Sequence, residues 1–357
     1  MYKQKKILIT GGAGFIGGAL IRRILKESDA KIFNIDKMGY ASDLSFLDKI
    51  GNSKERHFHL DIDLKLFEKT NHAIQKIDPD LIIHLAAESH VDRSLENPRN
   101  FLESNIIGTF NLLEATRIYW EKLSFERKKA FKFQHISTDE VFGSALGNNK
   151  FDENTCYNPR SPYSATKASS DHLVRAWYHS FDLPIIITNC SNNYGPFQFP
   201  EKLIPLSILK AINNKPIPIY GDGKNIRDWL FIEDHIDAIV LAGTKGKVGE
   251  SFCIGGNNEI TNLSIMHLIC SYLDEFIPKN KPHAKLINFV QDRPGHDKRY
   301  AINSEKIQQH LDWQAKTNLE EGLKITVKWY LDNLNWCEKL LSQSGYKSER
   351  LGIGIKK

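Results

Sequence analysis

The chain of 357 residues has no long hydrophobic run: no apolar stretch reaches about 18 residues, the length that a helix needs to cross a bilayer. Residues 1–6 lead directly into an apolar segment, without a signal-peptide core and its small-residue cleavage site. Cysteine is also scarce, with five scattered residues and no Cys-x-x-Cys pair. This pattern disfavours a disulfide framework and a zinc site. We therefore expect a cytoplasmic, soluble protein with reduced thiols and no bound metal.

Charge of one sign is not in large excess either. Lys and Arg number 48 against 43 Asp and Glu, and no basic cluster is interleaved with stacking aromatic residues. This balance disfavours nucleic-acid binding, and it fits both an anionic small-molecule substrate and an ordinary soluble surface. Hydrophobic residues make up 41% of the chain and charged residues 25%, so a sizeable core can form. The length exceeds that of one usual core, which predicts one large domain and a smaller lobe.

Short apolar segments alternate with helical patterns in the first half of the chain. We expect strands at 6–10, 31–36, 56–61, 80–86, 132–138 and 184–189, and helices at 15–26, 98–122 and 164–181. This alternation is typical of an α/β protein with a Rossmann-like, doubly wound parallel sheet, in which ligands bind at the carboxyl ends of the strands.

Proline and glycine become frequent after residue 194. We assign 1–194 to the Rossmann domain, 195–330 mainly to a smaller α+β substrate lobe, and 331–357 to the end of the last helix and a tail, which we expect to be frayed from residue 335 onward. The boundary at 194 is soft, because later segments such as 251–254 have a strand pattern that can rejoin the main sheet.

A glycine-rich turn follows the first predicted strand and opens a helix, which would bring backbone N–H groups to a pyrophosphate. The residues of this turn that we expect to contact a dinucleotide are Gly11, Gly14, Phe15, Ile16 and Gly17. Asp36 ends the second strand 19 residues after Gly17, where a carboxylate accepts hydrogen bonds from the adenosine ribose hydroxyls. We therefore expect NAD as the cofactor, although Lys37 leaves NADP open.

The ends of the next two strands lie at the same edge of the expected sheet. Asp61 and Ile62 come after the third strand, where they can meet the adenine. Leu85, Ala86 and Ala87 follow the fourth strand, where they can line the pyrophosphate and the nicotinamide ribose. Their position alone fits ordinary strand ends equally well.

Tyr163 and Lys167 lie four residues apart on a predicted helix, so both side chains project from one face. A phenol, with a usual pKa of about 10, is a poor base at neutral pH. A nearby ammonium group and the positive charge of nicotinamide both favour the phenolate. Such a pair is often only a solvated helix face, but after a dinucleotide-binding turn it indicates a catalytic base.

Thr138, Asp139 and Glu140 stand at the carboxyl end of a central strand, in the region of the expected ligand crevice. Elimination of water requires an acid and a base, and two close carboxyl groups can have their pKa values separated into these roles. The alternative is a solvated loop, which is the commonest position of an Asp-Glu pair.

With these motifs the chain resembles the extended short-chain dehydrogenase/reductases, and among them the dTDP-glucose 4,6-dehydratases. The resemblance covers about residues 5–330 and rests on eight motifs, at 10–17, 84–92, 137–143, 163–167, 189–196, 199–205, 227–229 and 292–297. The triplet Thr138-Asp139-Glu140 is the most discriminating, because the related 4-epimerases generally carry other small residues there.

The resemblance implies a three-step reaction on a nucleotide-linked glucose. Tyr163, supported by Lys167, takes the proton of the 4-hydroxyl as hydride passes from carbon 4 to NAD, and Thr138 hydrogen-bonds the same oxygen. Glu140 then removes the proton at carbon 5, while Asp139 protonates the departing 6-hydroxyl. Return of the hydride to carbon 6 gives a 4-keto-6-deoxy sugar.

The resemblance also implies binding roles by position. Ser104 and Asn193 would contact the cofactor, whereas Met38-Gly39 replaces a Leu-Thr of the family, so a hydroxyl contact to the cofactor ribose can be missing. The residues implied to contact the nucleotide diphosphate or the sugar are Ser89, Thr138, Asn192, Lys202, Leu203, Pro218, Tyr220, Arg227, Asn262, Arg293 and His296.

We also expect a homodimer, because the helices near 105–119 and 164–181 carry apolar residues on more than one face. These residues are Ile106, Ile107, Phe110, Leu112, Leu113, Leu173, Val174, Trp177 and Tyr178. A four-helix interface would bury them, and packing within the chain is the alternative.

Two other functions stay open: a nucleotide-sugar 4-epimerase or decarboxylase, and a non-catalytic NAD-sensing regulator. Thymine and uracil are not distinguished as the base of the substrate.

Overall fold

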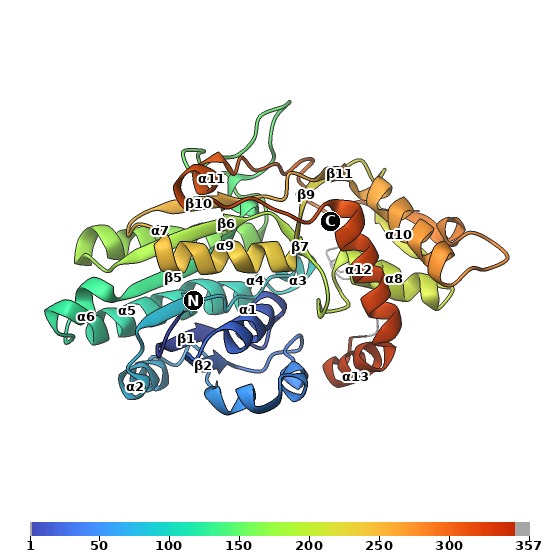
Figure 1. Ribbon diagram of the computed structural model, residues 1–357. Coiled ribbons are helices and arrows are strands. Elements are labelled where there is room, and N and C mark those ends of the chain that lie inside the picture. The colour runs from blue at the N-terminus through green and yellow to red at the C-terminus, as the bar shows by residue number, and fades with distance from the viewer. Residues whose placement is uncertain (1, 347–357) are drawn as a thin grey trace.

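A parallel sheet of seven strands forms the centre of the computed structural model, which describes residues 2–346 (Figure 1). In spatial order its strands are β10 (Ser251–Ile254), β6 (Ile185–Cys190), β5 (Lys132–Thr138), β4 (Leu81–His84), β1 (Lys6–Thr10), β2 (Lys31–Asp36) and β3 (His57–Asp61). The order β3-β2-β1-β4-β5-β6 is that of a Rossmann fold, and β10 is added beside β6. Because the strands are parallel, their carboxyl ends share one edge of the sheet.

Helices cover both faces of this sheet. α1 (Phe15–Glu27) and α9 (Ile232–Lys245) lie on one face, and α2 (Phe67–Ile77), α5 (Gly108–Trp120) and α7 (Pro162–Phe181) lie on the other. In β1, Ile7 and Ile9 are buried on the α1 side and Leu8 on the α5 side. Alternate side chains of a strand point to opposite faces, so a strand that is covered on both faces needs a continuous apolar run.

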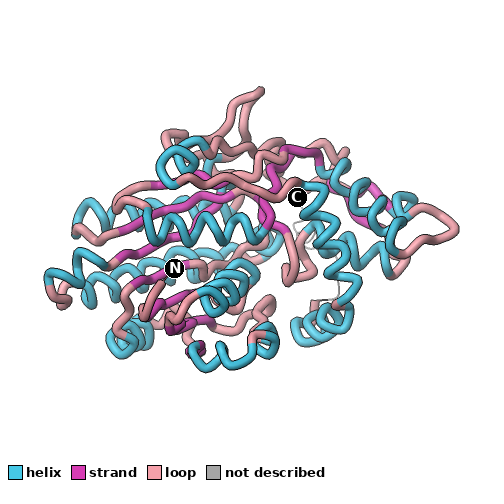
Figure 2. The backbone as a smooth tube through the Cα atoms, in the orientation of Figure 1, coloured by secondary structure: helices cyan, strands magenta, loops and turns pink. Residues whose placement is uncertain are grey.

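A smaller lobe lies beside the main sheet, where helices surround a short pair of strands (Figure 2). It contains the parallel strands β8 (Ile217–Tyr220) and β12 (Ile287–Val290), with α8 (Leu203–Ile212), α10 (Asn262–Phe276) and α12 (Leu319–Asp332). The strands β11 (Glu259–Thr261), β9 (Ile226–Phe231) and β7 (Asn192–Tyr194) form another small sheet. The other elements are α3 (Val91–Glu96), α4 (Pro98–Phe101), α6 (Phe125–Ala130), α11 (Glu305–Leu311), α13 (Leu334–Ser344), η1 (Ser45–Lys49), η2 (Gly51–Arg56), η3 (Leu102–Ile107), η4 (Asp139–Phe142) and η5 (His283–Leu286).

The elements predicted in the first half of the chain agree closely with the structure. The strands expected at 6–10, 31–36 and 132–138 have these bounds, and 251–254 rejoins the main sheet as β10. The helix expected at 98–122 is interrupted, because the π-helix η3 separates α4 from α5. Such turns are frequent at functional sites, and this one contains Ser104.

The prediction of a frayed tail from residue 335 is wrong for the part that the structure describes. α13 packs against the segment before α8, where Leu340 and Phe199 share an apolar cluster. The indole N–H of Trp336 donates to Asp43 Oδ2 at 2.9 Å. The apolar residues of this segment recur with helical spacing, a signal that its polar composition concealed. Residues 347–357 lie outside the described range.

Two kinds of feature are absent from residues 2–346. No helix there has both the length and the apolar character that crossing a membrane requires. No group of three or more His, Cys, Asp or Glu side chains there is placed to hold a metal ion.

Candidate active site

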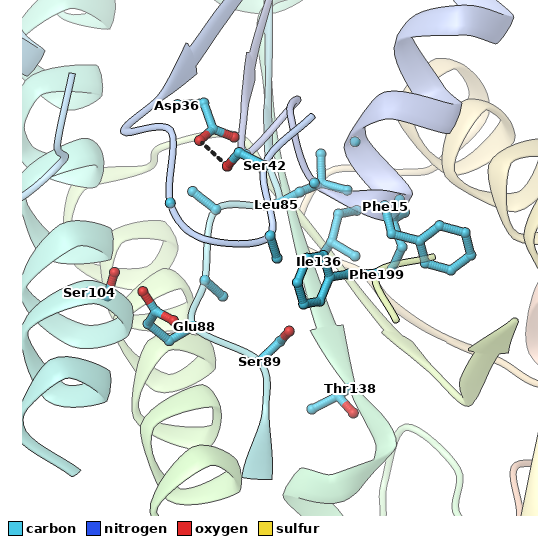
Figure 3. A pocket seen from close by; sticks show the side chains of 18 of the residues that line it. Phe15, Asp36, Ser42, Leu85, Glu88, Ser89, Ser104, Ile136, Thr138 and Phe199 are labelled. Atoms are coloured by element: carbon cyan, nitrogen blue, oxygen red, sulfur yellow. Dashed lines mark hydrogen bonds between the residues drawn. The ribbon is translucent and has the colours of Figure 1, made fainter. Parts of the chain in front are cut away.

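One elongated cleft follows the carboxyl ends of the central strands. Figure 3 shows Asp36 and Ser42 at one end of this cleft and Thr138 at the other. The predicted cofactor-contacting residues that line it are Gly11, Gly14, Phe15, Ile16, Gly17, Asp36, Lys37, Ile62, Leu85, Ala86, Ala87, Ser104, Tyr163, Lys167 and Asn193. Asp61 is not among the lining residues; it is exposed at the end of β3, and its neighbour Ile62 faces the cleft instead.

The turn between β1 and α1 requires glycine at two positions. Gly11 has a φ of +74°, and a Cβ there would lie 2.6 Å from the backbone nitrogen of Ala86. A Cβ at Gly17 would overlap the carbonyl oxygen of Gly11. Within the described residues no side chain caps α1 at Gly14, so N–H groups of its first turn can serve an anion. These features fit the pyrophosphate of a dinucleotide.

Three donors of the chain hold the Asp36 carboxylate. Its Oδ2 accepts from the Ala13 N–H at 3.0 Å, and its Oδ1 accepts from the Met38 N–H at 2.9 Å and the Ser42 hydroxyl at 3.1 Å. Ser42 also lines the cleft, so a hydroxyl is present close to the position where Met38-Gly39 departs from the family pattern. A fixed carboxylate here fits ribose hydroxyls and opposes a 2′-phosphate.

Lys37, which left NADP open, has partners of its own. Its ammonium group donates to Glu88 Oε1 at 2.9 Å and to Ser104 Oγ at 3.1 Å. Glu88 therefore compensates the positive charge that a 2′-phosphate would require. This arrangement favours NAD over NADP, and the sequence analysis did not single out Glu88.

Two hydrogen bonds hold the side chain of Asn193, which lines the cleft. Its Nδ2 donates to the Ser191 carbonyl at 2.9 Å, and its Oδ1 lies 2.7 Å from Nδ1 of His235 on α9. Burial lowers the pKa of His235 to about 3, so the ring is neutral, and its Nδ1–H donates to the amide oxygen. Sequence reasoning missed His235, which is 42 residues from Asn193 in the chain.

Tyr163 lies in the first turn of α7, which begins with a serine capping box and a proline. Lys167, one turn later, donates through Nζ to the Ile136 carbonyl at 2.9 Å. Burial raises the pKa of Tyr163 well above its usual value, and Glu140 raises it further. Lys167 alone therefore does not lower the pKa of Tyr163 enough to form the phenolate. The second charge expected to favour the phenolate, that of a bound nicotinamide, would have to lower this pKa further.

Asp139 and Glu140 form the turn η4 directly after β5. Thr138 caps this turn: its Oγ1 accepts from the Glu140 N–H at 3.3 Å and donates to Asp139 Oδ1 at 3.2 Å. Asp139 is completely buried, and its Oδ2 has no hydrogen-bond partner in residues 2–346. Burial raises the pKa of Asp139 well above its usual range, and Glu140 adds to this effect. The alternative of a solvated loop is excluded for Asp139.

Glu140 has different surroundings from Asp139. Burial raises the pKa of Glu140 as well, but Arg293, Arg227 and Lys202 oppose the rise. An acid whose pKa lies well above its usual range therefore stands beside one whose pKa is also raised, but against the opposing effect of three cations. Elimination of water needs such a pair, because one group donates a proton and the other accepts one.

A second pocket adjoins the cleft at Glu140 and extends into the smaller lobe. Of the residues predicted to contact substrate, Thr138 lines the cleft, and this pocket is lined by Ser89, Asn192, Lys202, Leu203, Pro218, Tyr220, Arg227, Asn262, Arg293 and His296. Several of its side chains bury a polar atom that lacks a partner in the described part of the chain, namely Asn192 Oδ1, Trp229 Nε1, Asn262 Oδ1 and Arg293 Nε. Such atoms cost stability, so their concentration here indicates a polar ligand.

The three cations of this pocket are held at fixed positions. Lys202 Nζ donates to the Ser89 carbonyl at 2.8 Å, and Arg227 Nη2 donates to the Asp297 carbonyl at 3.0 Å. Arg293 Nη1 lies 3.5 Å from an oxygen of Asp92, a residue that the sequence analysis did not assign. Guanidinium groups match phosphate oxygens in pairs, so the pocket suits a diphosphate next to the acid pair.

These features occur together in one class of enzyme, the extended short-chain dehydrogenase/reductases, as the sequence resemblance implied. Comparison with known families narrows the class further. The model of the family described as GDP-mannose 4,6 dehydratase matches residues 8–326, and the chain belongs to this family.

Named relatives within this class are similar over nearly the whole chain. A dTDP-glucose 4,6-dehydratase of Neisseria meningitidis serogroup B is 50% identical over 357 residues, covering 98% of this chain and 100% of the relative. The structure of dTDP-glucose 4,6-dehydratase from Bacillus anthracis in complex with NAD has a TM-score of 0.83 at 41% identity, covering 94% of this chain and 99% of that one. The enzyme of that name from Streptomyces venezuelae, solved with NAD bound, has a TM-score of 0.86 at 34% identity, with the same coverage of 94% and 99%.

Proposed function

We propose that this protein is an NAD-dependent hydro-lyase that converts dTDP-glucose into the 4-keto-6-deoxy sugar. The observation that carries the proposal is Glu140, which lines both the cleft and the second pocket, with the buried carboxyl group of Asp139 directly before it in the turn η4. A 4-epimerase oxidises and reduces carbon 4 and has no use for such an acid pair. The similarity to dTDP-glucose 4,6-dehydratases and to their NAD-bound structures supports the choice of substrate and cofactor.

Each residue of the acid–base group handles a different proton. Tyr163 receives the proton of the 4-hydroxyl, and Thr138, on the neighbouring strand end, orients the same oxygen. Glu140, whose pKa would rise further on burial without the three nearby cations, removes the proton at carbon 5. Asp139, which keeps its proton because it is buried, donates it to the departing 6-hydroxyl. The bound nicotinamide would supply the acceptor for the hydride of carbon 4 and the donor of hydride to carbon 6, and Glu140 would return the proton to carbon 5, which completes the 4-keto-6-deoxy sugar.

The binding roles follow from the two cavities. We assign the dinucleotide to the cleft, with its pyrophosphate at the glycine turn and its adenosine ribose at Asp36. The nucleoside diphosphate occupies the second pocket, where Arg227, Arg293 and Lys202 converge. We accordingly assign substrate binding mainly to residues 195–330 and cofactor binding mainly to residues 1–194, which is the division proposed from the sequence.

We further propose a homodimer in the cytoplasm. Large apolar side chains are exposed on η3, α5 and α7: Leu102 at 50%, Ile107 at 47%, Phe110 at 40% and Phe181 at 41%. Trp177 lies against two of them, Phe110 and Phe181, with edge-to-face ring contacts. Other residues expected at the interface are instead buried within the chain, namely Leu112, Leu113 and Val174. Cysteines that are all free thiols suit a reducing compartment.

One incubation tests the reaction and its substrate. The protein is mixed with dTDP-glucose, or with UDP-glucose as the matched control, and the products are analysed by mass spectrometry. We expect loss of one water from dTDP-glucose, and slower loss or none from UDP-glucose. With Glu140→Gln, reduced cofactor should accumulate without loss of water, since oxidation at carbon 4 precedes elimination. A product of unchanged mass that is epimerised at carbon 4 would refute the proposal.

A further inference from the structure

Asp171 is a buried carboxylate that the proposed reaction does not use. It lies on α7, one turn after Lys167, and none of its surface is exposed. Its Oδ1 lies 3.1 Å from Nε2 of His135, and its Oδ2 accepts from the hydroxyls of Ser137 and Tyr157, both at 2.8 Å. Burial acts to raise the pKa of Asp171, but the hydrogen bond from His135, the charge of Lys167 and the hydrogen bond from Tyr157 lower it below its usual value. The group is therefore an anion in the core.

The contacts of Asp171 and Lys167 hold three consecutive residues of β5. Asp171 binds the side chains of His135 and Ser137, and Lys167 binds the carbonyl of the residue between them. Asn189 of β6 donates to Asp171 Oδ2 and also to the Thr138 carbonyl, in both cases at 3.2 Å. Helix α7 is thus hydrogen-bonded to β5 and β6 immediately before Thr138-Asp139-Glu140, the triplet that contains the acid pair.

Lys167 requires a counter-charge, because its ammonium group is buried and burial lowers its pKa. Asp171 opposes this lowering. The other titratable groups that face Lys167 are His84 of β4, His135 of β5, Cys190 of β6 and Tyr163 of α7. Burial lowers the pKa of both histidines and raises those of the thiol and the phenol, so these groups are neutral. Within residues 2–346, Asp171 is the one carboxylate that acts on Lys167.

We propose that Asp171 is a positioning residue of this active site. It supplies the negative charge that compensates Lys167, and its hydrogen bonds hold β5 and β6 in place against α7. It lines neither the cleft nor the pocket, and both of its carboxylate oxygens already bind groups of the chain, so we do not assign it a contact with substrate or cofactor. The proposal rests on the proposed function in so far as Lys167 supports Tyr163 there. Arg175, which lies 3.4 Å from the Tyr157 hydroxyl, is a further cation near Asp171 and remains unchanged in the test.

The first test is the pH dependence of kcat and KM for dTDP-glucose. In Asp171→Asn, kcat should fall at least about 10-fold with KM changed less than about 3-fold, because the charge acts on the chemical step and not on binding. The alkaline limb of kcat should move down by about one pH unit or more, since Lys167 loses its proton more easily without the anion. Asp171→Glu should return the limb to its original pH, even where kcat remains low.

Tyr157→Phe and Ser137→Ala are the matched controls, because each removes one hydrogen bond to Asp171 and leaves its charge. Both should keep the wild-type pH profile. A profile of Asp171→Asn that coincides with the wild type after scaling would show that Asp171 is only structural. An equal shift in Tyr157→Phe would have the same meaning.

The second test measures stability and does not depend on which reaction the site catalyses. Thermal unfolding is compared for the wild type, Asp171→Asn, Lys167→Met and the double variant. If the two groups form a charge pair, Lys167→Met should restore about half or more of the stability lost in Asp171→Asn, because the unpaired ammonium is removed. If Asp171→Asn does not fold alone, folding of the double variant supports the proposal and its failure overturns it. Additive losses overturn it too, whatever the outcome for the reaction.

Discussion

The two ends of the proposed active site are built differently. We call the part of the cleft at the glycine turn and Asp36 the dinucleotide end, and the second pocket the sugar end. At the dinucleotide end the wall is largely backbone, and the polar side chains already have partners: Asp36 accepts from three donors, and Lys37 is paired with Glu88. At the sugar end the wall is made of side chains. Buried atoms of Asn262 and Arg293 there lack partners in the described range.

Folding therefore gives partners to the polar groups at the dinucleotide end, whereas at the sugar end a bound ligand would have to supply them. The dinucleotide end is part of the β1–α1–β2 unit, so a chain that folds has formed it. The sugar end carries three cations and several unpaired polar atoms, which cost stability until a ligand binds them. We therefore expect substitutions at the first end to affect folding and binding together, and substitutions at the second end to affect binding alone.

The largest effect should come from Gly11→Ala. The substitution places a Cβ at a φ of +74° and 2.6 Å from the Ala86 nitrogen, so the turn must shift. We expect a loss of about 3 kcal/mol in the free energy of unfolding, together with loss of copurified dinucleotide. Gly147→Ala is the control, since Gly147 also has a positive φ, of +54°, but a Cβ there would meet nothing within 4 Å, and the residue does not line the cleft. Thermal unfolding and the dinucleotide released on denaturation measure both quantities; equal behaviour of the two variants would contradict the prediction.

A smaller effect, of opposite pattern, is expected for Asn262→Leu in the sugar pocket. Its Oδ1 is buried without a partner among the described residues, so the apolar side chain should leave stability unchanged or raise it by about 1 kcal/mol. The KM for dTDP-glucose should rise about 10-fold. Asn258→Leu is the control, because its Nδ2 donates to the carbonyls of Trp229 and Gly256 and its loss should destabilise the chain. A clear loss of stability in Asn262→Leu would remove the distinction between the two ends.

The sequence predicts the dinucleotide end well because its determinants are local. The glycine turn and Asp36 lie on one β–α–β unit, and Tyr163 and Lys167 share one helical turn. The residues that sequence reasoning missed act across long separations: Glu88 reaches Lys37 over 51 positions, and His235 reaches Asn193 over 42. No pattern within one segment reveals such pairs, since the folded sheet brings them together.

Two other misses had signals in the sequence. Asp171 follows Lys167 by four residues, so its place on the same face of α7 could have been predicted. The C-terminal segment has apolar residues at helical spacing, but its Ser, Gln and Gly content favoured a frayed end over helix α13. At the sugar end, the position of Thr138, Asp139 and Glu140 after a central strand indicated the acid pair, whereas the family pattern alone indicated the residues of the second pocket.

A further effect concerns the pH dependence of stability, in which the buried His235 should differ from an exposed histidine. Because the folded-state pKa of buried His235 is about 3, against a usual value near 6.5, its contribution to stability is present above pH 6.5 and is lost as the pH falls toward 3. The slope reaches about 1.4 kcal/mol per pH unit for one such group. His235→Gln should therefore lose less stability than the wild type between pH 6.5 and 4. The control is His72→Gln at an exposed position, and denaturant unfolding at several pH values makes the comparison. Parallel losses in all three proteins would contradict it.

The smallest effect concerns the C-terminal helix at the dinucleotide end. Trp336 donates from α13 to Asp43 Oδ2 at 2.9 Å. The Asp43 N–H donates to the Ala13 carbonyl at 2.8 Å, which joins this contact to the glycine turn. Trp336→Phe removes one hydrogen bond and keeps most of the apolar contact, so dinucleotide release should accelerate about 2–10-fold.

The matched control is Trp313→Phe, which removes an indole hydrogen bond to the Asp234 carbonyl, at a site that does not line the cleft. Release is followed by transferring the holoenzyme into a large excess of labelled NAD and measuring exchange over time. Faster exchange in Trp336→Phe than in Trp313→Phe, with an unchanged KM for dTDP-glucose, would place α13 with the dinucleotide end, as the contacts of Asp43 indicate. Equal exchange rates would show that the helix only covers apolar surface, and a raised KM would assign it to the sugar end.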